Sequence, residues 1–255
     1  MVTNQQTMDT RRRTDLLLAE YAARYETEGF LDGDPSWFMH QVEGRLDRET
    51  LAFVASCLSY GSRKQFFPKI QYVLDCSGGE VHEWVRSGAF AGDIPDDGEC
   101  YYRLYTRHVM HSFLSALRSM LREHGSIGGY VGARAHDGLS AVEAICGFFR
   151  EHGVEAVVPK DASSACKRVC MFLRWMVRDN SPVDLGLWSG FIDKRTLIMP
   201  LDTHVVQESV RLGLLSGKAA SMAAARRLTA RMLEVFPDDP LKGDFALFGY
   251  GVNHG

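Results

Sequence analysis

The sequence lacks the features that place a chain in a membrane or export it from the cell. Its 255 residues contain no run of the roughly 18 or more apolar residues that a membrane-spanning helix requires. The N-terminal stretch MVTNQQTMDTRRRTDLLLAEY has three arginines, but neither the apolar centre nor the small-residue cleavage site of a signal peptide. We therefore expect a cytoplasmic protein.

Cysteine pairs and a strong charge of either sign are also missing. The six cysteines include no CxxC pair, which argues against a zinc or iron–sulfur site built on cysteine. Without an export signal they are expected to be buried thiols rather than disulfides. The net charge of −3 argues against a protein coated with positive charge for non-specific nucleic-acid binding, although it allows a local basic face.

Alternating strand patterns and internal repeats are absent, whereas helical spacing of apolar residues runs through most of the chain. We predict an all-α fold of about ten helices, forming a single globular unit over residues 1–255. Two interlocked lobes are expected, one over residues 30–155 and one over residues 156–255 together with an N-terminal helix at 12–27. The predicted helices cover 14–25, 47–58, 64–74, 80–86, 102–124, 139–151, 163–178, 203–212, 218–236 and 242–252.

Residues 163–178, SSACKRVCMFLRWMVR, combine an apolar stripe with a lysine near the beginning of the predicted helix. The two cysteines on this stripe are more typical of core positions than of a metal-binding half-site. With Ser163 or Ser164 as the N-cap, Lys167 falls in the first turns, where a positive charge is poorly placed for helix stability. The same helix field favours a neutral amine, which is a nucleophile. An ordinary solvated lysine is the alternative.

Asp202 stands between Pro200 and the apolar-periodic segment that begins at Thr203. Because proline disfavours helix at the residue before it, Asp202 is placed at or beside the N-cap of the next helix. The simpler interpretation is a helix cap, and the functional interpretation is a catalytic carboxylate. Asp202 and His204 are two apart and do not face the same way on a helix, so a metal site is disfavoured.

Taken together, CKRVCMFLRWMV and MPLDTHVVQESVRLGLL resemble the catalytic core of the helix-hairpin-helix DNA glycosylases, including their endonuclease III and 8-oxoguanine glycosylase branches. The best overall resemblance is to an uncharacterised bacterial family related to this superfamily. It implies a glycosylase-like fold with a degenerate hairpin, acting as a monomer without a cofactor on damaged or abasic duplex DNA in the nucleoid. The chain ends at Gly255 without the cysteine cluster of some endonuclease III relatives, so no iron–sulfur cluster is expected.

The resemblance also implies a role for each candidate residue. Lys167 matches the lysine that attacks the sugar of a flipped nucleotide and forms a Schiff base, which permits abasic-site strand cleavage. Asp202 matches the aspartate that stabilises positive charge on the sugar. The side chains expected around the base are Tyr60, Trp175, Trp188 and His204, which would otherwise be core or cap residues. The cations expected at DNA phosphates, otherwise plain solvated charges, are Arg63, Lys64, Lys160, Arg168, Arg174, Lys194 and Arg195.

The sequence departs from the glycosylase pattern at two places. VVPKDASSACK, residues 157–167, replaces a glycine-rich hairpin, so Lys160 and the following helix N-terminus would have to hold the phosphate. Residues 178–196 form an insertion that must loop out if Lys167 and Asp202, 35 positions apart, are to meet. The alternative function is a non-catalytic module that keeps the fold and binds nucleic acid or protein. A metal-dependent enzyme using His204 or His254 is a third, less favoured hypothesis.

Overall fold

A computed structural model describes residues 4–254, which are mainly helical with a short two-stranded sheet. The prediction of an all-α protein is confirmed. Residues 1–3, which begin the stretch analysed for a signal peptide, and Gly255 lie outside the described residues. Within residues 4–254, no helix combines the length and the apolar character needed to cross a bilayer.

The elements have the following bounds in chain order. The α-helices are α1 Asn4–Tyr25, α2 Arg45–Leu58, α3 Arg63–Ser77, α4 Val81–Ser87, α5 Phe90–Asp93, α6 Arg107–His124, α7 Ile127–Gly132, α8 Gly138–Glu151, α9 Lys167–Val177, α10 Thr203–Arg211, α11 Met222–Val235 and α12 Lys242–His254. The 3-10 helices are η1 Glu28–Leu31, η2 Pro35–His40 and η3 Lys194–Thr196. The strands β1 Cys100–Tyr102 and β2 Tyr105–Thr106 pair antiparallel.

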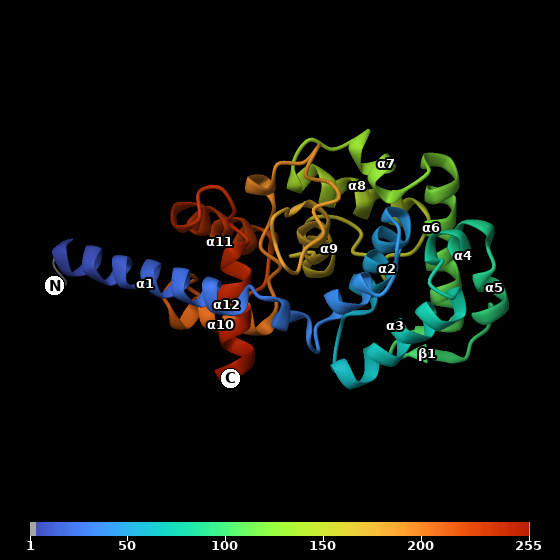
Figure 1. The fold of residues 1–255 in the computed structure, drawn as a ribbon, viewed down its shortest axis with the longest axis horizontal. Coiled ribbons are helices and arrows are strands. Elements are labelled where there is room, and N and C mark those ends of the chain that lie inside the picture. Colours follow the sequence, from blue (N-terminus) through green and yellow to red (C-terminus); the bar gives the residue numbers. More distant parts are fainter. Residues whose placement is uncertain (1–3, 255) are drawn as a thin grey trace.

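The first and the last helix lie together on one side of the molecule (Figure 1). Helix α1 packs along α12, and α12 also packs on α10, so the first helix completes a group formed by the last ones. Helices α2 to α8 form the second group, in which α2 contacts α4, α3 and η2. Helix α9 packs on α2 and α8 and lies between the two groups in Figure 1.

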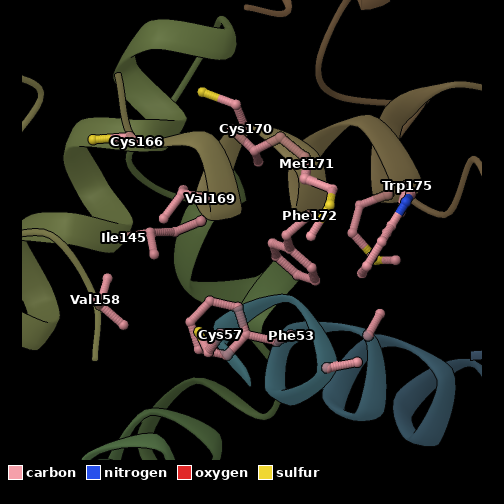
Figure 2. Close-up of a cluster of buried hydrophobic side chains, with 14 of the residues drawn as sticks. Phe53, Cys57, Ile145, Val158, Cys166, Val169, Cys170, Met171, Phe172 and Trp175 are labelled. Atoms are coloured by element: carbon pink, nitrogen blue, oxygen red, sulfur yellow. The ribbon is translucent and has the colours of Figure 1, made fainter. Parts of the chain in front are cut away.

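The apolar face of α9 fixes this helix in the core. Figure 2 shows Val169 and Phe172 of α9 directed toward Ile145 of α8 and Phe53 of α2. The rings of Phe53 and Phe172 meet edge to face with centroids 5.0 Å apart. Because each buried side chain of this size contributes about 1.5–3 kcal/mol, the position of α9, and of Lys167 at its beginning, is strongly determined.

Two short regions that the sequence analysis left without helix are ordered by their neighbours. The segment GSIGGYVG contains α7, in which the Ser126 hydroxyl accepts a hydrogen bond from the Gly129 amide at 2.8 Å. The stretch 89–101, which no predicted helix covers, contains α5 and most of β1. Because residues 100–106 pair as the β1–β2 hairpin, the helix predicted over 102–124 begins only at Arg107, with Thr106 as its N-cap.

The insertion at 178–196 does not loop out, and this expectation is corrected. The Leu185 and Trp188 amides donate to the α9 carbonyls of Trp175 and Met176 at 2.8 and 2.7 Å. The buried Trp188 indole N–H donates to Glu49 of α2 at 2.7 Å. The segment therefore packs on α9 and α2 as part of the core.

Candidate functional site

A cavity of about 580 Å³ opens among segments that are far apart in the sequence. Its volume lies within the range of about 300–1,000 Å³ that is usual for small-molecule sites. The contributing segments are the η1–η2 region, the turn from α2 into α3, the first half of α9, the residues around the start of α10, and α12. The lining includes Phe30, Tyr60, Arg63, Phe66, Lys167, Arg174, Asp202, His204, Asp244 and Phe248.

Lys167 and Asp202 line the same cavity. Lys167 is the first residue of α9 and Asp202 is the N-cap of α10, so each side chain projects from the beginning of its own helix. Both residues are partly exposed. The structure thus brings together the amine and the carboxylate that are separated by 35 positions in the sequence.

The beginning of α9 differs from the prediction in a way that concerns Lys167. Cys166, in left-handed conformation with φ 45°, is the N-cap, and neither Ser163 nor Ser164 caps the helix. Ser164 is held instead in an antiparallel β-bridge with Ser221, which keeps this part of the chain extended. Lys167 forms no side-chain hydrogen bond or ion pair with any of the residues 4–254, so its amine is free to meet a ligand.

Asp202 is the helix cap that the sequence predicted. Its Oδ1 accepts a hydrogen bond from the Val205 amide at 2.8 Å. Its second carboxylate oxygen accepts no hydrogen bond from the described part of the chain. A single side chain can therefore cap α10 with one oxygen and present the other to the cavity.

His204 and Phe248 form the wall beside Asp202. The two rings meet edge to face with centroids 6.0 Å apart. The His204 Nδ1 is buried and has no hydrogen-bond partner in the described residues. Because a buried polar atom without a partner is costly, this nitrogen is suited to bind a polar group of a ligand.

Asp244 places a second carboxyl group in the cavity, deeper than Asp202. It is almost completely buried and forms an ion pair with Arg174. Burial raises the pKa of Asp244 to about 6; Arg174 opposes this rise and the charge of Asp202 adds to it. At neutral pH, above this pKa, the Asp244 carboxylate is mainly ionised, and its ion pair with Arg174 stabilises the negative charge.

Arg174 is not the surface cation that the sequence analysis expected. Its side chain is buried, with the guanidinium Nε 3.2 Å from Asp184 Oδ1 and a further ion pair to Asp244. The guanidinium carbon also lies 4.5 Å from the centroid of the Phe245 ring. With these partners Arg174 is not available to an external DNA phosphate, and that expectation is corrected.

A second buried arginine, Arg178, follows Arg174 by four positions and forms the C-cap of α9. Arg178 donates to both oxygens of Asp239 at 2.8 and 2.7 Å, to Glu26 at 2.6 Å, and to Asp184. Such doubly hydrogen-bonded pairs are the strong form of the arginine–carboxylate contact. This network, for which sequence spacing gave no signal, joins α9 to the chain after α1, to residue 184, and to the turn before α12.

The other predicted cations fall into two groups. Arg63 lines the cavity, 5.9 Å from the centroid of the Phe248 ring, and Lys64 and Lys160 are exposed. Arg168 donates instead to Cys57 and Tyr105, while Lys194 and Arg195 pair with Asp179 and Asp193 outside the cavity lining.

Of the four residues predicted to surround a base, two line the cavity and two lie in the core. Tyr60 and His204 line the cavity, but Trp175 and Trp188 do not, and both indoles are fully buried. Their placement beside a base is therefore corrected: they are core residues. The cavity is instead walled by Phe30, Phe66 and Phe248, whose apolar character in helical segments gave no sign of exposure to a site. Within residues 4–254, no group of three or more His, Cys, Asp or Glu side chains is placed to hold a metal ion.

Comparison with known proteins assigns the family. Residues 34–253 match the family described as "Protein of unknown function (DUF2400)", and because this match covers most of the chain, the protein belongs to that family. This finding overturns the assignment to the helix-hairpin-helix DNA glycosylases suggested by the lysine and aspartate segments. No curated protein and no solved structure matches the chain.

Proposed function

We propose that this member of the DUF2400 family removes a damaged base from DNA and cleaves the resulting abasic site, with Lys167 as nucleophile and Asp202 as stabilising carboxylate. The proposal rests on the chemistry of the cavity and not on membership of a glycosylase family. The observation that carries it is that a free amine and a half-free carboxylate, each at a helix start, line one cavity of about 580 Å³.

The reaction assigns a separate task to each of the two groups. As the bond from the sugar C1′ to the base breaks, positive charge develops on the sugar, and the free Asp202 oxygen stabilises it. The Lys167 amine, in its neutral form, bonds to C1′ while the base leaves with the bonding electrons and takes up a proton, and the amine then loses a proton to solvent or a carboxylate. The C1′–O4′ bond breaks, O4′ is protonated, and the opened sugar becomes an imine. Loss of a proton from C2′ to solvent then expels the 3′ phosphate and cleaves the strand.

The composition of the remaining cavity walls supports the proposal that an extruded nucleotide binds there. Base-modifying enzymes take their target out of the duplex and bind it by stacking and by polar contacts. Tyr60, Phe66 and Phe248 offer aromatic surface, and the unpartnered His204 Nδ1 offers a polar contact. Arg63 in the lining, with Lys64 exposed beside it, supplies positive charge for neighbouring phosphates. We place this activity in the cytoplasm, on nucleoid DNA.

Borohydride trapping tests the proposal. The protein is incubated with duplexes that carry an abasic site or one of several damaged bases, and sodium borohydride reduces any imine to a stable adduct. We expect an adduct with the unmodified protein and none with Lys167→Ala. The matched control, Lys218→Ala, removes an exposed lysine outside the cavity lining that has no assigned role in DNA binding, and it is expected to retain trapping. Binding of DNA without an adduct on any duplex would overturn the proposal in favour of a non-catalytic binding module.

A further inference from the structure

Two cysteine side chains contact each other at the beginning of α9, next to Lys167 in the chain. The Cys146 sulfur of α8 lies 3.9 Å from the Cys166 sulfur, and both side chains are buried. Cys166 is the residue immediately before Lys167 and forms the N-cap of α9. Figure 2 shows the Cys166 side chain at the beginning of α9, directed toward α8. Neither thiol takes part in the proposed reaction.

We propose that Cys146 and Cys166 are a site of reversible disulfide formation, with a peroxide as the oxidant. The sulfur atoms are already in contact, so a modest approach brings them to the bonded distance of about 2.05 Å. The pair is also distinct from the other cysteines: Cys100 is exposed and Cys76 is partly buried, and neither contacts another cysteine in the described residues.

The surroundings give the two sulfurs different roles. The hydrogen bond from the Cys146 thiol, with a further one from Ser164, lowers the pKa of Cys166 to about 7, while the contact with Cys166 raises the pKa of Cys146. Thiolate is the reactive form of cysteine. Cys166 is therefore the sulfur that meets the oxidant, and Cys146 is the sulfur that resolves the product.

The reaction balances in two steps. The Cys166 thiolate attacks one oxygen of hydrogen peroxide, a sulfur–oxygen bond forms, the oxygen–oxygen bond breaks, and hydroxide leaves to be protonated to water. The Cys146 thiol then attacks the sulfenic sulfur, a sulfur–sulfur bond forms, and a second water leaves with the thiol proton. Both cysteines are oxidised by one electron each, and the peroxide is reduced to two waters.

The disulfide would act on the start of α9. Cys166 has the left-handed backbone conformation that non-glycine residues rarely adopt, and Lys167 follows it directly. Drawing the Cys166 sulfur toward α8 shifts this strained turn and with it the Lys167 backbone. In this part, which rests on the proposed function, oxidation is expected to lower imine trapping by at least several-fold and a dithiol to restore it.

Peptide mapping of the intact protein tests the site itself. The protein is titrated with hydrogen peroxide, free thiols are alkylated, and a non-reducing digest is analysed by mass spectrometry. We expect a cross-linked peptide joining Cys146 to Cys166 that disappears on reduction with dithiothreitol. Cys146→Ala is expected to abolish the cross-link, whereas Cys170→Ala, which removes the other nearby buried thiol, is expected to keep it.

Two results would overturn the site. One is oxidation of the exposed Cys100 with no cross-link at Cys166, and the other is a cross-link from Cys166 to Cys170. Trapping assays on the same samples separate the two proposals. A protein that forms the Cys146–Cys166 cross-link but never traps DNA retains the thiol site and loses the repair function. A protein that traps DNA equally before and after cross-linking contradicts the effect of oxidation on Lys167.

Discussion

Asp202 combines a structural task with a chemical one, and the two can be separated by substitution. One oxygen caps α10 through the Val205 amide, and the other is free toward the cavity. Asparagine caps helices about as well as aspartate but carries no charge. Folding therefore depends on the capping oxygen of this side chain, whereas the proposed reaction depends on its negative charge.

Asp202→Asn is therefore expected to leave the free energy of unfolding within about 0.5 kcal/mol of the unmodified protein. Trapping on abasic DNA should fall at least about 100-fold, because the charge that stabilises the transition state is lost. Asp202→Ala should show the same fall in trapping together with a loss of about 1 kcal/mol in stability. Chemical denaturation and adduct formation rates measure the two effects, and undiminished trapping by Asp202→Asn would contradict the assigned role.

Asp244 makes stability depend on pH in a defined direction. Its pKa is raised to about 6 in the folded protein, whereas an unfolded aspartate has a pKa of about 4. A raised pKa means that folding favours the protonated carboxyl, so this contribution is fully present below about pH 4 and is lost as pH rises through about 6.

Asp244→Asn has no titratable group at this position. Its free energy of unfolding should therefore lack the decrease that Asp244 causes as pH rises. We expect the variant to gain stability relative to the unmodified protein as pH rises from about 4 to about 6, by at most about 3 kcal/mol. Above that window the difference should be constant. Urea denaturation at pH 4, 5, 6 and 7 measures it, and a difference that shrinks with rising pH would show that the folded pKa is not raised.

Among the structural elements, the 178–196 segment shows how tertiary contacts override sequence expectation. Glu49 is buried in α2 and accepts hydrogen bonds from the Trp188 indole at 2.7 Å and from the Ile127 and Gly128 amides at 2.8 and 3.1 Å. One carboxylate thereby joins the segment, α2 and the beginning of α7. Burial raises the pKa of Glu49 even though these donors oppose the rise.

Trp188→Phe should destabilise the protein by about 2–4 kcal/mol, because it removes a buried donor and leaves unfilled volume. Trp37→Phe is the matched control, since Trp37 is 38% exposed, and its effect should stay within about 0.5 kcal/mol. Guanidinium denaturation compares the two variants. Equal stability of both would mean that the segment is not held through the indole.

The helices that could be predicted from the sequence are those with a long apolar stripe. The spacing predicted helices at α6, α8 and α9, the apolar stripe of residues 163–178 is the buried face of α9, and proline with aspartate at 200–202 located the cap of α10. The short helices α5 and α7 escaped prediction because distant side chains stabilise them. The start of α9 was misplaced because Ser164 pairs with Ser221, and no local pattern reveals a contact across 57 positions.

In the molecule as a whole, a buried charge network joins α9 and the 178–196 segment to the helices at the two ends of the chain. Arg174 and Arg178 of α9 reach Asp184, Asp239, Asp244 and Glu26, which lie after α1, on the 178–196 segment, and before or within α12. The sequence showed two arginines four positions apart but not their partners. For this reason the sequence suggested a surface cation for DNA at Arg174, where the structure has a buried ion pair in the cavity wall.

Arg178→Ala should cost about 3–5 kcal/mol, because buried carboxylates lose their partner. Arg178→Lys should recover only part of this loss, since an ammonium group cannot replace the two-pronged contact with Asp239. Arg195→Ala breaks an exposed ion pair and should change stability by less than about 1 kcal/mol. A thermal denaturation series on the three variants reports this order, and a stable Arg178→Ala protein would contradict the network's role.

The central claim is that the Lys167 amine, in the cavity that Asp202 also lines, attacks the sugar of a nucleotide. Its most direct test is to digest the borohydride-reduced adduct with abasic DNA and to locate the modified residue by tandem mass spectrometry. We predict the sugar remnant on the Lys167 nitrogen. A remnant on the N-terminal amine or on another lysine, or no adduct at all, would contradict the claim.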